Sequence, residues 1–258
     1  MKIIFTIFLL FITSYSLQAQ SMSEDTWLKV EYMQVEPADM NGFLASVEYG
    51  YKQVQKQRVE SGEIQRWHFY RVPYSGDKSK SYNFVSVIMA SSLNDLQTEN
   101  QLNTSEYRTA LGKKKPSKHV VHTEIWNTES IVNDGVQHTP SRYKNVNYMN
   151  ATAGRLDDYL NLETEIAGPL HTHQMQNGRM DGWEFHRLVF PTGVETPFNF
   201  ITTDFYSDLE QIEMGITRDI IREVHPQMDV DEFDEFADAI RERNYSDLWE
   251  LLEYAIPD

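Results

Sequence analysis

The chain has 258 residues, a formal net charge of −16, 12% aromatic residues and no cysteine. A strongly acidic surface repels nucleic acids and anionic lipids, so we expect neither as a partner. Without cysteine there are no disulfides, no thiolate nucleophiles and no thiolate metal ligands. The aromatic content favours a packed globular protein over a disordered one.

The first twenty residues have the layout of a secretory signal peptide. Lys2 gives a positive start, residues 3–17 are almost entirely apolar, and Ala19 lies at a position suited to cleavage. The apolar run of about 15 residues is shorter than the roughly 20 that span a bilayer, so an uncleaved anchor is the weaker alternative. We expect a signal peptide at 1–20 and an exported protein, periplasmic or extracellular, with no membrane contact after cleavage.

The chain contains an internal repeat with a spacing of 116 residues. Residues 30–93 align with 146–209 without a gap, and 12 of the 64 positions are identical. Two tryptophans fall in register, Trp67 with Trp183. Unrelated sequences would share only a few positions, so we interpret the repeat as a tandem duplication.

Each copy predicts the same order of elements. In the first copy the apolar periodicity predicts one long helix at 39–58 and four strands, at 28–35, 64–74, 81–90 and 118–126. In the second copy we expect the helix at 155–176 and the four strands at 144–151, 180–190, 197–206 and 245–254. A second helix is expected after Ser92 and after Asp208, which suit helix N-caps. The order β-α-β-β-α-β, twice, predicts an α+β fold of two ferredoxin-like modules, at 21–135 and 136–258.

Both copies carry the same short pattern of glycine, tryptophan, phenylalanine and arginine. It reads Gly62-x4-Trp67-x-Phe69-x-Arg71 in the first copy and Gly178-x4-Trp183-x-Phe185-x-Arg187 in the second. Together with the duplication, this pattern resembles the dimeric α+β barrel superfamily, which includes antibiotic-biosynthesis monooxygenases. The resemblance implies that the bare faces of the two sheets pack together, as an intramolecular dimeric α+β barrel with a pocket between the halves. Whether the chain also forms oligomers stays open.

Strand alternation divides the second strand of each copy into two faces. The Trp-Phe-Arg face is expected to be structural, with an alternative role for Arg71 and Arg187 in holding an anionic ligand. The other face carries His68 and Tyr70 in the first copy and Glu184 and His186 in the second. Such divergence is expected if only one half keeps a pocket.

The helix predicted at 155–176 carries two more candidate residues. Glu163 and His171 lie eight positions apart, near one face of the helix, and with His186 they form the preferred site, because imidazole titrates near neutral pH. His171 and His173 form a His-x-His pair, but on a helix their side chains point about 200° apart. No metal site is therefore expected.

Two functions stay open. The first is an exported small-molecule-binding or scaffolding protein, which needs no cofactor and agrees with the absence of nucleophile-elbow, phosphate-loop and His-Glu-x-x-His motifs. The alternative is an oxidoreductase of monooxygenase-like type acting on a small aromatic molecule, either cofactor-free or haem-dependent. His171 or His186 would then be the base or haem ligand, and Arg187 would stabilise an anion.

Overall fold

The computed structural model describes residues 26–77, 82–96, 118–133, 140–193 and 196–257. The predicted signal peptide and most of the segment after Ser92 lie outside these ranges. Within them, no helix has both the length and the apolar character needed to cross a membrane.

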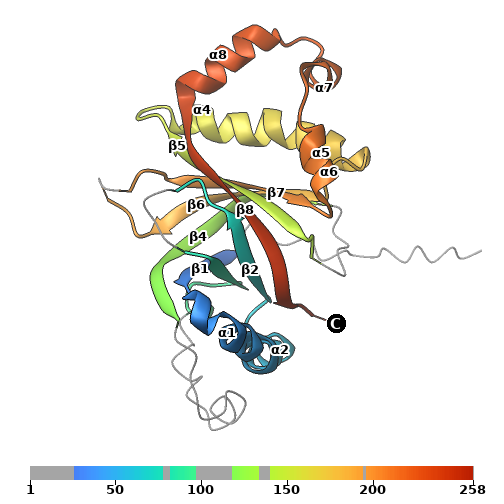
Figure 1. The fold of residues 1–258 in the computed structure, drawn as a ribbon. Helices are drawn as coiled ribbons and strands as arrows, with labels where there is room; N and C mark the ends of the chain where they lie inside the picture. The colour runs from blue at the N-terminus through green and yellow to red at the C-terminus, as the bar shows by residue number, and fades with distance from the viewer. Residues whose placement is uncertain (1–25, 78–81, 97–117, 134–139, 194–195, 258) are drawn as a thin grey trace, which may run out of the picture.

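Eight strands form one closed barrel (Figure 1). The first half contributes β1 (Trp27–Gln34), β2 (Arg66–Tyr74), β3 (Phe84–Ala90) and β4 (His119–Asn133). The second half contributes β5 (Tyr143–Ala151), β6 (Gly182–Phe190), β7 (Phe200–Tyr206) and β8 (Arg241–Ala255). The order around the barrel is β1-β3-β2-β8-β5-β7-β6-β4, and every pairing is antiparallel. Each half therefore keeps its own four strands together, and the barrel closes where β2 meets β8 and β4 meets β6.

The two halves share one strand register. Trp27 lies opposite Ala90 in the β1–β3 pair, and Tyr143 lies opposite Tyr206 in the β5–β7 pair, a shift of 116 on both strands. Corresponding strands, such as β1 and β5, lie four positions apart around the barrel. Because neighbouring strands are antiparallel, strands four positions apart run in the same direction. The halves are thus related by an approximate two-fold axis along the barrel.

Equivalent tyrosines meet inside the barrel. The hydroxyl groups of Tyr32 and Tyr148 lie 2.8 Å apart, and the Tyr32 hydroxyl also donates to the Glu124 carboxylate at 2.7 Å. Around them lie fully buried apolar and aromatic side chains, among them Val30, Tyr70, Val85, Trp126 and Val146. The expected sheet-to-sheet packing therefore takes the form of a continuous barrel wall that encloses one core.

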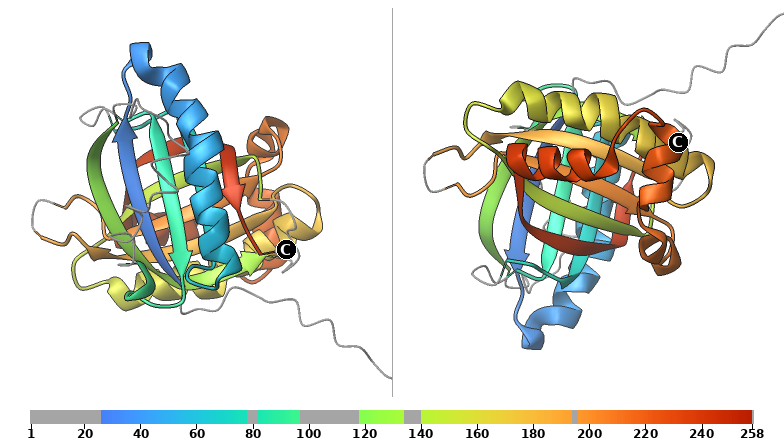
Figure 2. Two further views of the ribbon diagram at one scale, coloured as in Figure 1. Left: turned by 90° about the horizontal axis from the view of Figure 1, so that it is seen from below. Right: turned by 90° about the horizontal axis from the view of Figure 1, so that it is seen from above.

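Helices cover the outside of the barrel on two sides (Figure 2). The first half has η1 (Pro37–Asp39), α1 (Met40–Ser46), the π-helical turn η2 (Val47–Tyr51) and α2 (Lys52–Glu60). The second half has α4 (Leu156–Asn161), the π-helical turn η4 (Leu162–Ala167), α5 (Gly168–Gln176), α6 (Leu209–Met214), α7 (Arg218–Val224) and α8 (Val230–Ile240). Both long predicted helices exist, but each is interrupted by a π-helical turn at the corresponding place.

The repeated Trp-Phe face packs against these helices. Trp67 and Phe69 are buried with Phe43 of α1, and Trp183 and Phe185 are buried with Tyr159 of α4. The ring centroids of Phe43 and Phe69 lie 5.9 Å apart. The predicted structural role of this face is confirmed for its aromatic residues.

A loop of the first half is fixed to the last strand of the second. The backbone N–H of Gly76 donates to Asp247 of β8 at 2.9 Å. A Cβ atom on Gly76 would lie only 2.6 Å from the carbonyl oxygen of Ser246 and 2.8 Å from Cβ of Tyr245. Only glycine fits this close approach between the halves.

We expect Gly76→Ala to lower the free energy of unfolding by about 1–3 kcal/mol, because the methyl group must displace backbone. Urea unfolding of the full chain measures the change. Gly193→Ala is the matched control, since nothing lies within 4 Å of its Cβ position. Equal unfolding midpoints for the two variants would contradict the close contact.

Candidate functional site

The layer between helix and sheet carries different side chains in the two halves. Four positions that carry Phe, Val, Gln and Ile in the first half carry Tyr, Glu, His and Asp in the second: Phe43/Tyr159, Val47/Glu163, Gln55/His171 and Ile88/Asp204. In the first half Phe43, Val47 and Ile88 belong to the buried core beneath the helices. Since the strand registers of the two halves match, each position of the second half can be compared with its equivalent in the first, where these side chains only pack together. The polar replacements mark the second half as the candidate site.

Glu163 is a carboxyl group held in the helix–sheet layer. It lies on the π-helical turn η4 and is only 4% exposed. One carboxylate oxygen is 3.8 Å from Nε of Arg241 at the start of β8. Burial raises the pKa of Glu163 to about 7, although the positive charges of Arg241 and Arg243 act in the opposite direction. Glu163 can therefore gain or lose a proton near neutral pH.

His171 lies on α5, one helical segment further on. Its ring stacks on the indole of Trp183 with a centroid distance of 4.8 Å and an angle of 16°. Its Nδ1 atom is buried and has no hydrogen-bond partner in the described structure. Burial lowers the pKa of His171, partly offset by the negative charge of Asp204, so the ring is neutral near pH 7.

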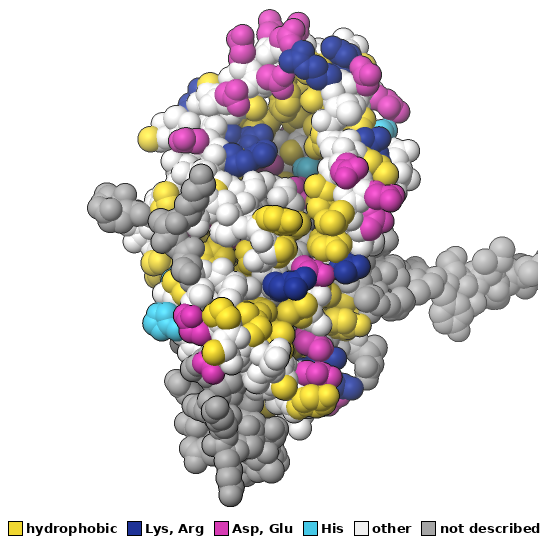
Figure 3. Space-filling view, viewed as in Figure 1, with side chains coloured by type: hydrophobic (Ala, Val, Ile, Leu, Met, Phe, Trp, Pro, Cys, Tyr) yellow, Lys and Arg dark blue, Asp and Glu magenta, His cyan; other side chains and the backbone are white. Residues whose placement is uncertain are grey.

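Polar side chains on the outer face of β5 and β7 extend this site. Asp204 accepts hydrogen bonds from the side-chain amides of Asn145 at 3.2 Å and Asn147 at 3.1 Å. Ser246 of β8 donates to Asn147 at 2.7 Å. Figure 3 shows that this face of the molecule is hollowed between α8, α7 and the helix beneath them, with charged side chains at the edge of the hollow. Charged, hydrogen-bonding and aromatic groups thus surround one region of the second half.

The barrel wall separates this region from three other predicted site residues. Tyr70, Glu184 and His186 alternate with the outward-facing aromatics and point into the barrel. The Nε2 atom of His186 lies 3.2 Å from Glu184, on the inner side of β6. The expected cluster of Glu163, His171 and His186 is therefore wrong, because the helix that carries the first two covers the outer face of the strand that carries the third.

The two predicted arginines lie on the outer surface. Arg71 pairs with Glu250, and Nε of Arg187 lies 2.6 Å from Glu129. Each guanidinium already has a carboxylate partner in a half-exposed position. This is the geometry of surface ion pairs and does not favour an anion-holding role.

Sequence reasoning missed Tyr159, Asp204 and Arg241. A signal for two of them was present in the repeat, because an apolar residue of the first copy aligns with a polar residue of the second. Phe43/Tyr159 and Ile88/Asp204 are such pairs.

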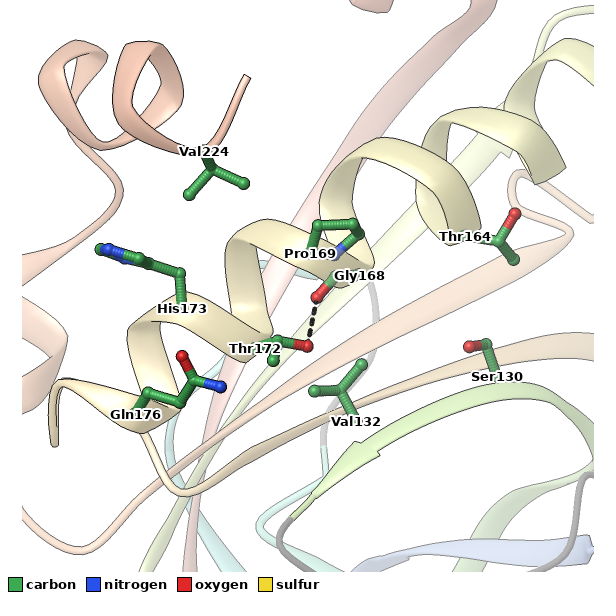
Figure 4. A pocket seen from close by; sticks show the side chains of 9 residues that line it. All are labelled: Ser130, Val132, Thr164, Gly168, Pro169, Thr172, His173, Gln176 and Val224. Carbon is green, nitrogen blue, oxygen red and sulfur yellow. Dashed lines mark hydrogen bonds between the residues drawn. The ribbon is translucent and has the colours of Figure 1, made fainter. Parts of the chain in front are cut away.

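A groove runs along the opposite side of α5, between that helix, β4 and α7 (Figure 4). Its volume is about 590 Å³, and Val132 and Val224 form part of its apolar lining. Thr172 donates to the backbone carbonyl of Gly168 at 2.9 Å, and Nε2 of His173 lies 3.2 Å from Glu223. The groove has the size of a small-ligand site, but these polar groups are engaged with their own surroundings.

The comparisons with known proteins identify the fold. No family model matches the chain, and no curated protein does. A proposed monooxygenase from Lactobacillus acidophilus has a TM-score of 0.56 at 8% identity, over 90% of this chain and 96% of that one. A chlorite dismutase variant from Candidatus Nitrospira defluvii, in complex with cyanide, has a TM-score of 0.51 at 12% identity, over 91% and 93%. An anthrone oxidase-like protein has a TM-score of 0.50 at 13% identity, over 92% and 94%. The chain therefore has the dimeric α+β barrel fold.

The haem-dependent alternative expected from the sequence needs a histidine that can reach a haem iron. A haem iron needs an accessible imidazole nitrogen beside a flat apolar slot. The Nδ1 atom of His171 is enclosed, and the rings of Trp183, Phe185 and Phe200 already stack on one another in the layer below it. His186 is fully buried, and its ring nitrogens lie 3.1 Å from the Thr128 hydroxyl and 3.2 Å from the Glu184 carboxylate. Neither histidine fits a haem iron in this conformation.

We expect the stability of the folded chain to depend on the charge of Glu163. Its pKa of about 7 lies above the value near 4.3 of an unfolded chain, so the folded state binds more protons between these pH values. The free energy of unfolding should therefore fall as the pH rises from about 4.5 to 7, by about 3 kcal/mol from this group.

Glu163→Gln should remove this decrease, as measured by urea unfolding between pH 5 and 8. Glu165→Gln, on the exposed side of the same turn, is the control and should leave it unchanged. An identical pH dependence in wild type and Glu163→Gln would show that Glu163 ionises normally.

Proposed function

We propose that this chain is an oxidoreductase of monooxygenase-like type that acts on a small aromatic molecule without a bound cofactor. The observation that carries the proposal is Glu163, a buried carboxyl with a pKa near neutrality where the equivalent half has Val47. The fold shared with a proposed monooxygenase and an anthrone oxidase-like protein supports this class over a scaffold, although fold alone assigns no activity.

The chemistry follows from the charges around Glu163. Its carboxylate removes a proton from an acidic C–H or O–H group of the substrate. Arg241 and Arg243 then stabilise the negative charge that develops on the substrate. The electron-rich anion reacts with dioxygen, so that a CH₂ group becomes a carbonyl and the second oxygen atom leaves as water.

His171 and Trp183 have a different role in this proposal. Trp183 is buried beneath the imidazole of His171, so an aromatic substrate meets the neutral imidazole and not the indole. Asn145, Asn147 and Asp204 on the strands below provide hydrogen-bonding groups for ring substituents. A hydroxylated aromatic ring is the substrate that suits both surfaces.

Oxygen uptake with a panel of hydroxylated anthrones, which carry the required CH₂ group, tests the activity. We expect turnover to rise with pH through about 7, as Glu163 loses its proton, and kcat to fall by about 10²–10⁴-fold in Glu163→Gln. Glu165→Gln should retain wild-type turnover. Full activity of Glu163→Gln would reject Glu163 as the base. A Soret band on adding haemin that disappears in His171→Ala would favour the haem-dependent alternative.

We also propose that the protein is exported after removal of residues 1–20, and that two ferredoxin-like modules, 21–135 and 136–258, arose by tandem duplication. The signal-peptide layout supports the first statement, and the common strand register supports the second. Its partner is then a small-molecule ligand, with no role for nucleic acid.

Expression of the full chain in a bacterial host tests export. N-terminal sequencing of protein from the periplasm or medium should give a start at Gln20 or Ser21. Accumulation in the cytoplasm with Met1 in place would contradict export.

A further inference from the structure

A second polar cluster lies inside the barrel, on the other face of the wall from Glu163. Lys144 of β5 is 3% exposed and occupies the position that Leu28 has in the first half. Its ammonium lies 4.3 Å from the ring centroid of Phe205 and 5.1 Å from that of Tyr70. No described residue forms a hydrogen bond or an ion pair within 4 Å with it. A buried cation in this state is costly unless something neutralises it.

The imidazole of His68, on β2, also lacks a partner on one side. His68 is 4% exposed, and its Nδ1 lies 3.0 Å from the Tyr70 hydroxyl. Its Nε2 is buried and has no hydrogen-bond partner in the described structure. Burial lowers the pKa of His68, and the positive charges of Lys144 and Arg66 lower it further, so the ring is neutral. A neutral imidazole carries one ring proton. When Nδ1 accepts a hydrogen bond from the Tyr70 hydroxyl, that proton lies on Nε2, where no described group accepts it.

The nearby carboxylate of Glu184 is not the missing hydrogen-bond acceptor for Lys144 or His68. It lies 3.2 Å from Nε2 of His186, whose Nδ1 lies 3.1 Å from the hydroxyl of Thr128. Burial alone would raise the pKa of Glu184, but the hydrogen bond from His186 and the charge of Lys144 outweigh it and lower the pKa to about 2. Glu184 is thus ionised and engaged with His186, while the ammonium of Lys144 keeps no direct partner.

We propose that this part of the barrel interior binds a small monovalent anion, a halide or a short carboxylate, between the ammonium of Lys144 and the Nε2–H of His68. Both groups are buried donors without a protein acceptor, and both lie beside Tyr70. Arg66 adds positive potential at this place, and Glu184 adds negative potential. The rings of Tyr70 and Phe205 form apolar walls beside the ammonium. The site is independent of the proposed oxidoreductase activity, because it lies on the opposite face of the sheet.

Thermal unfolding of the full chain at constant ionic strength tests the proposal. Sodium gluconate, whose anion is bulky, is replaced stepwise by chloride, bromide, formate or acetate. At about 100 times the dissociation constant, the bound anion should raise the melting temperature by roughly 5–10 °C. An effect of chloride and bromide alone identifies a halide site, and an effect of formate and acetate alone identifies a carboxylate site. No effect of any anion overturns the proposal.

Variants separate this site from general salt effects. Lys144→Met keeps the apolar stem and removes the charge, so it should fold and lose the anion-dependent shift. Lys56→Met, at an exposed position on α2, and Glu163→Gln should both retain it. Retention of the shift in Lys144→Met contradicts the proposal. A bromide soak of crystals gives a second measurement: an anomalous peak beside Lys144 Nζ and His68 Nε2 supports the site, and peaks only elsewhere reject it.

Discussion

The barrel exists because the outer strand of each half pairs with the last strand of the other half, β2 with β8 and β4 with β6. A four-stranded sheet with helices on one face leaves two strand edges unpaired and one apolar face uncovered. Pairing the halves at both edges removes every edge and encloses both bare faces in one core. The same pairing places Tyr70 opposite Leu251 and His186 opposite Thr128, so the interior combines side chains from both halves.

Within this shared frame the two halves differ in the polar side chains that they bury. Both retain the tryptophan and phenylalanine residues that hold helix to sheet, and both interrupt the long helix with a π-helical turn, a feature frequent at functional sites. Only the second half replaces core positions of that layer with Glu163 and Asp204, and only its inner wall carries Lys144 and Glu184. The first half also buries charged groups, Arg58 beside Gln55 and Glu124 beside Tyr32, so the halves differ in where these charges lie.

The repeat, the eight strands and the buried Trp-Phe face were predictable, because they depend on periodicity along the chain. The lengths of β4 and β8 were not. Residues 119–127 of β4 pair with β1 of the same half, whereas 125–133 pair with β6, a partner distant in sequence. The grouping of His186 with His171 failed for a similar reason. Helix and strand periodicity each assign a face, but only the packed structure shows which face of the strand the helix covers.

Hydrogen exchange of backbone amides, followed residue by residue in the folded chain, tests the closure of the barrel most directly. If the two junctions are as firmly paired as the sheets they join, amides in the β2–β8 and β4–β6 pairs will exchange only through global unfolding, like those of β1–β3 and β5–β7. Rapid exchange at the junctions, with protection kept inside each half, would contradict a single closed barrel and describe two sheets that separate independently.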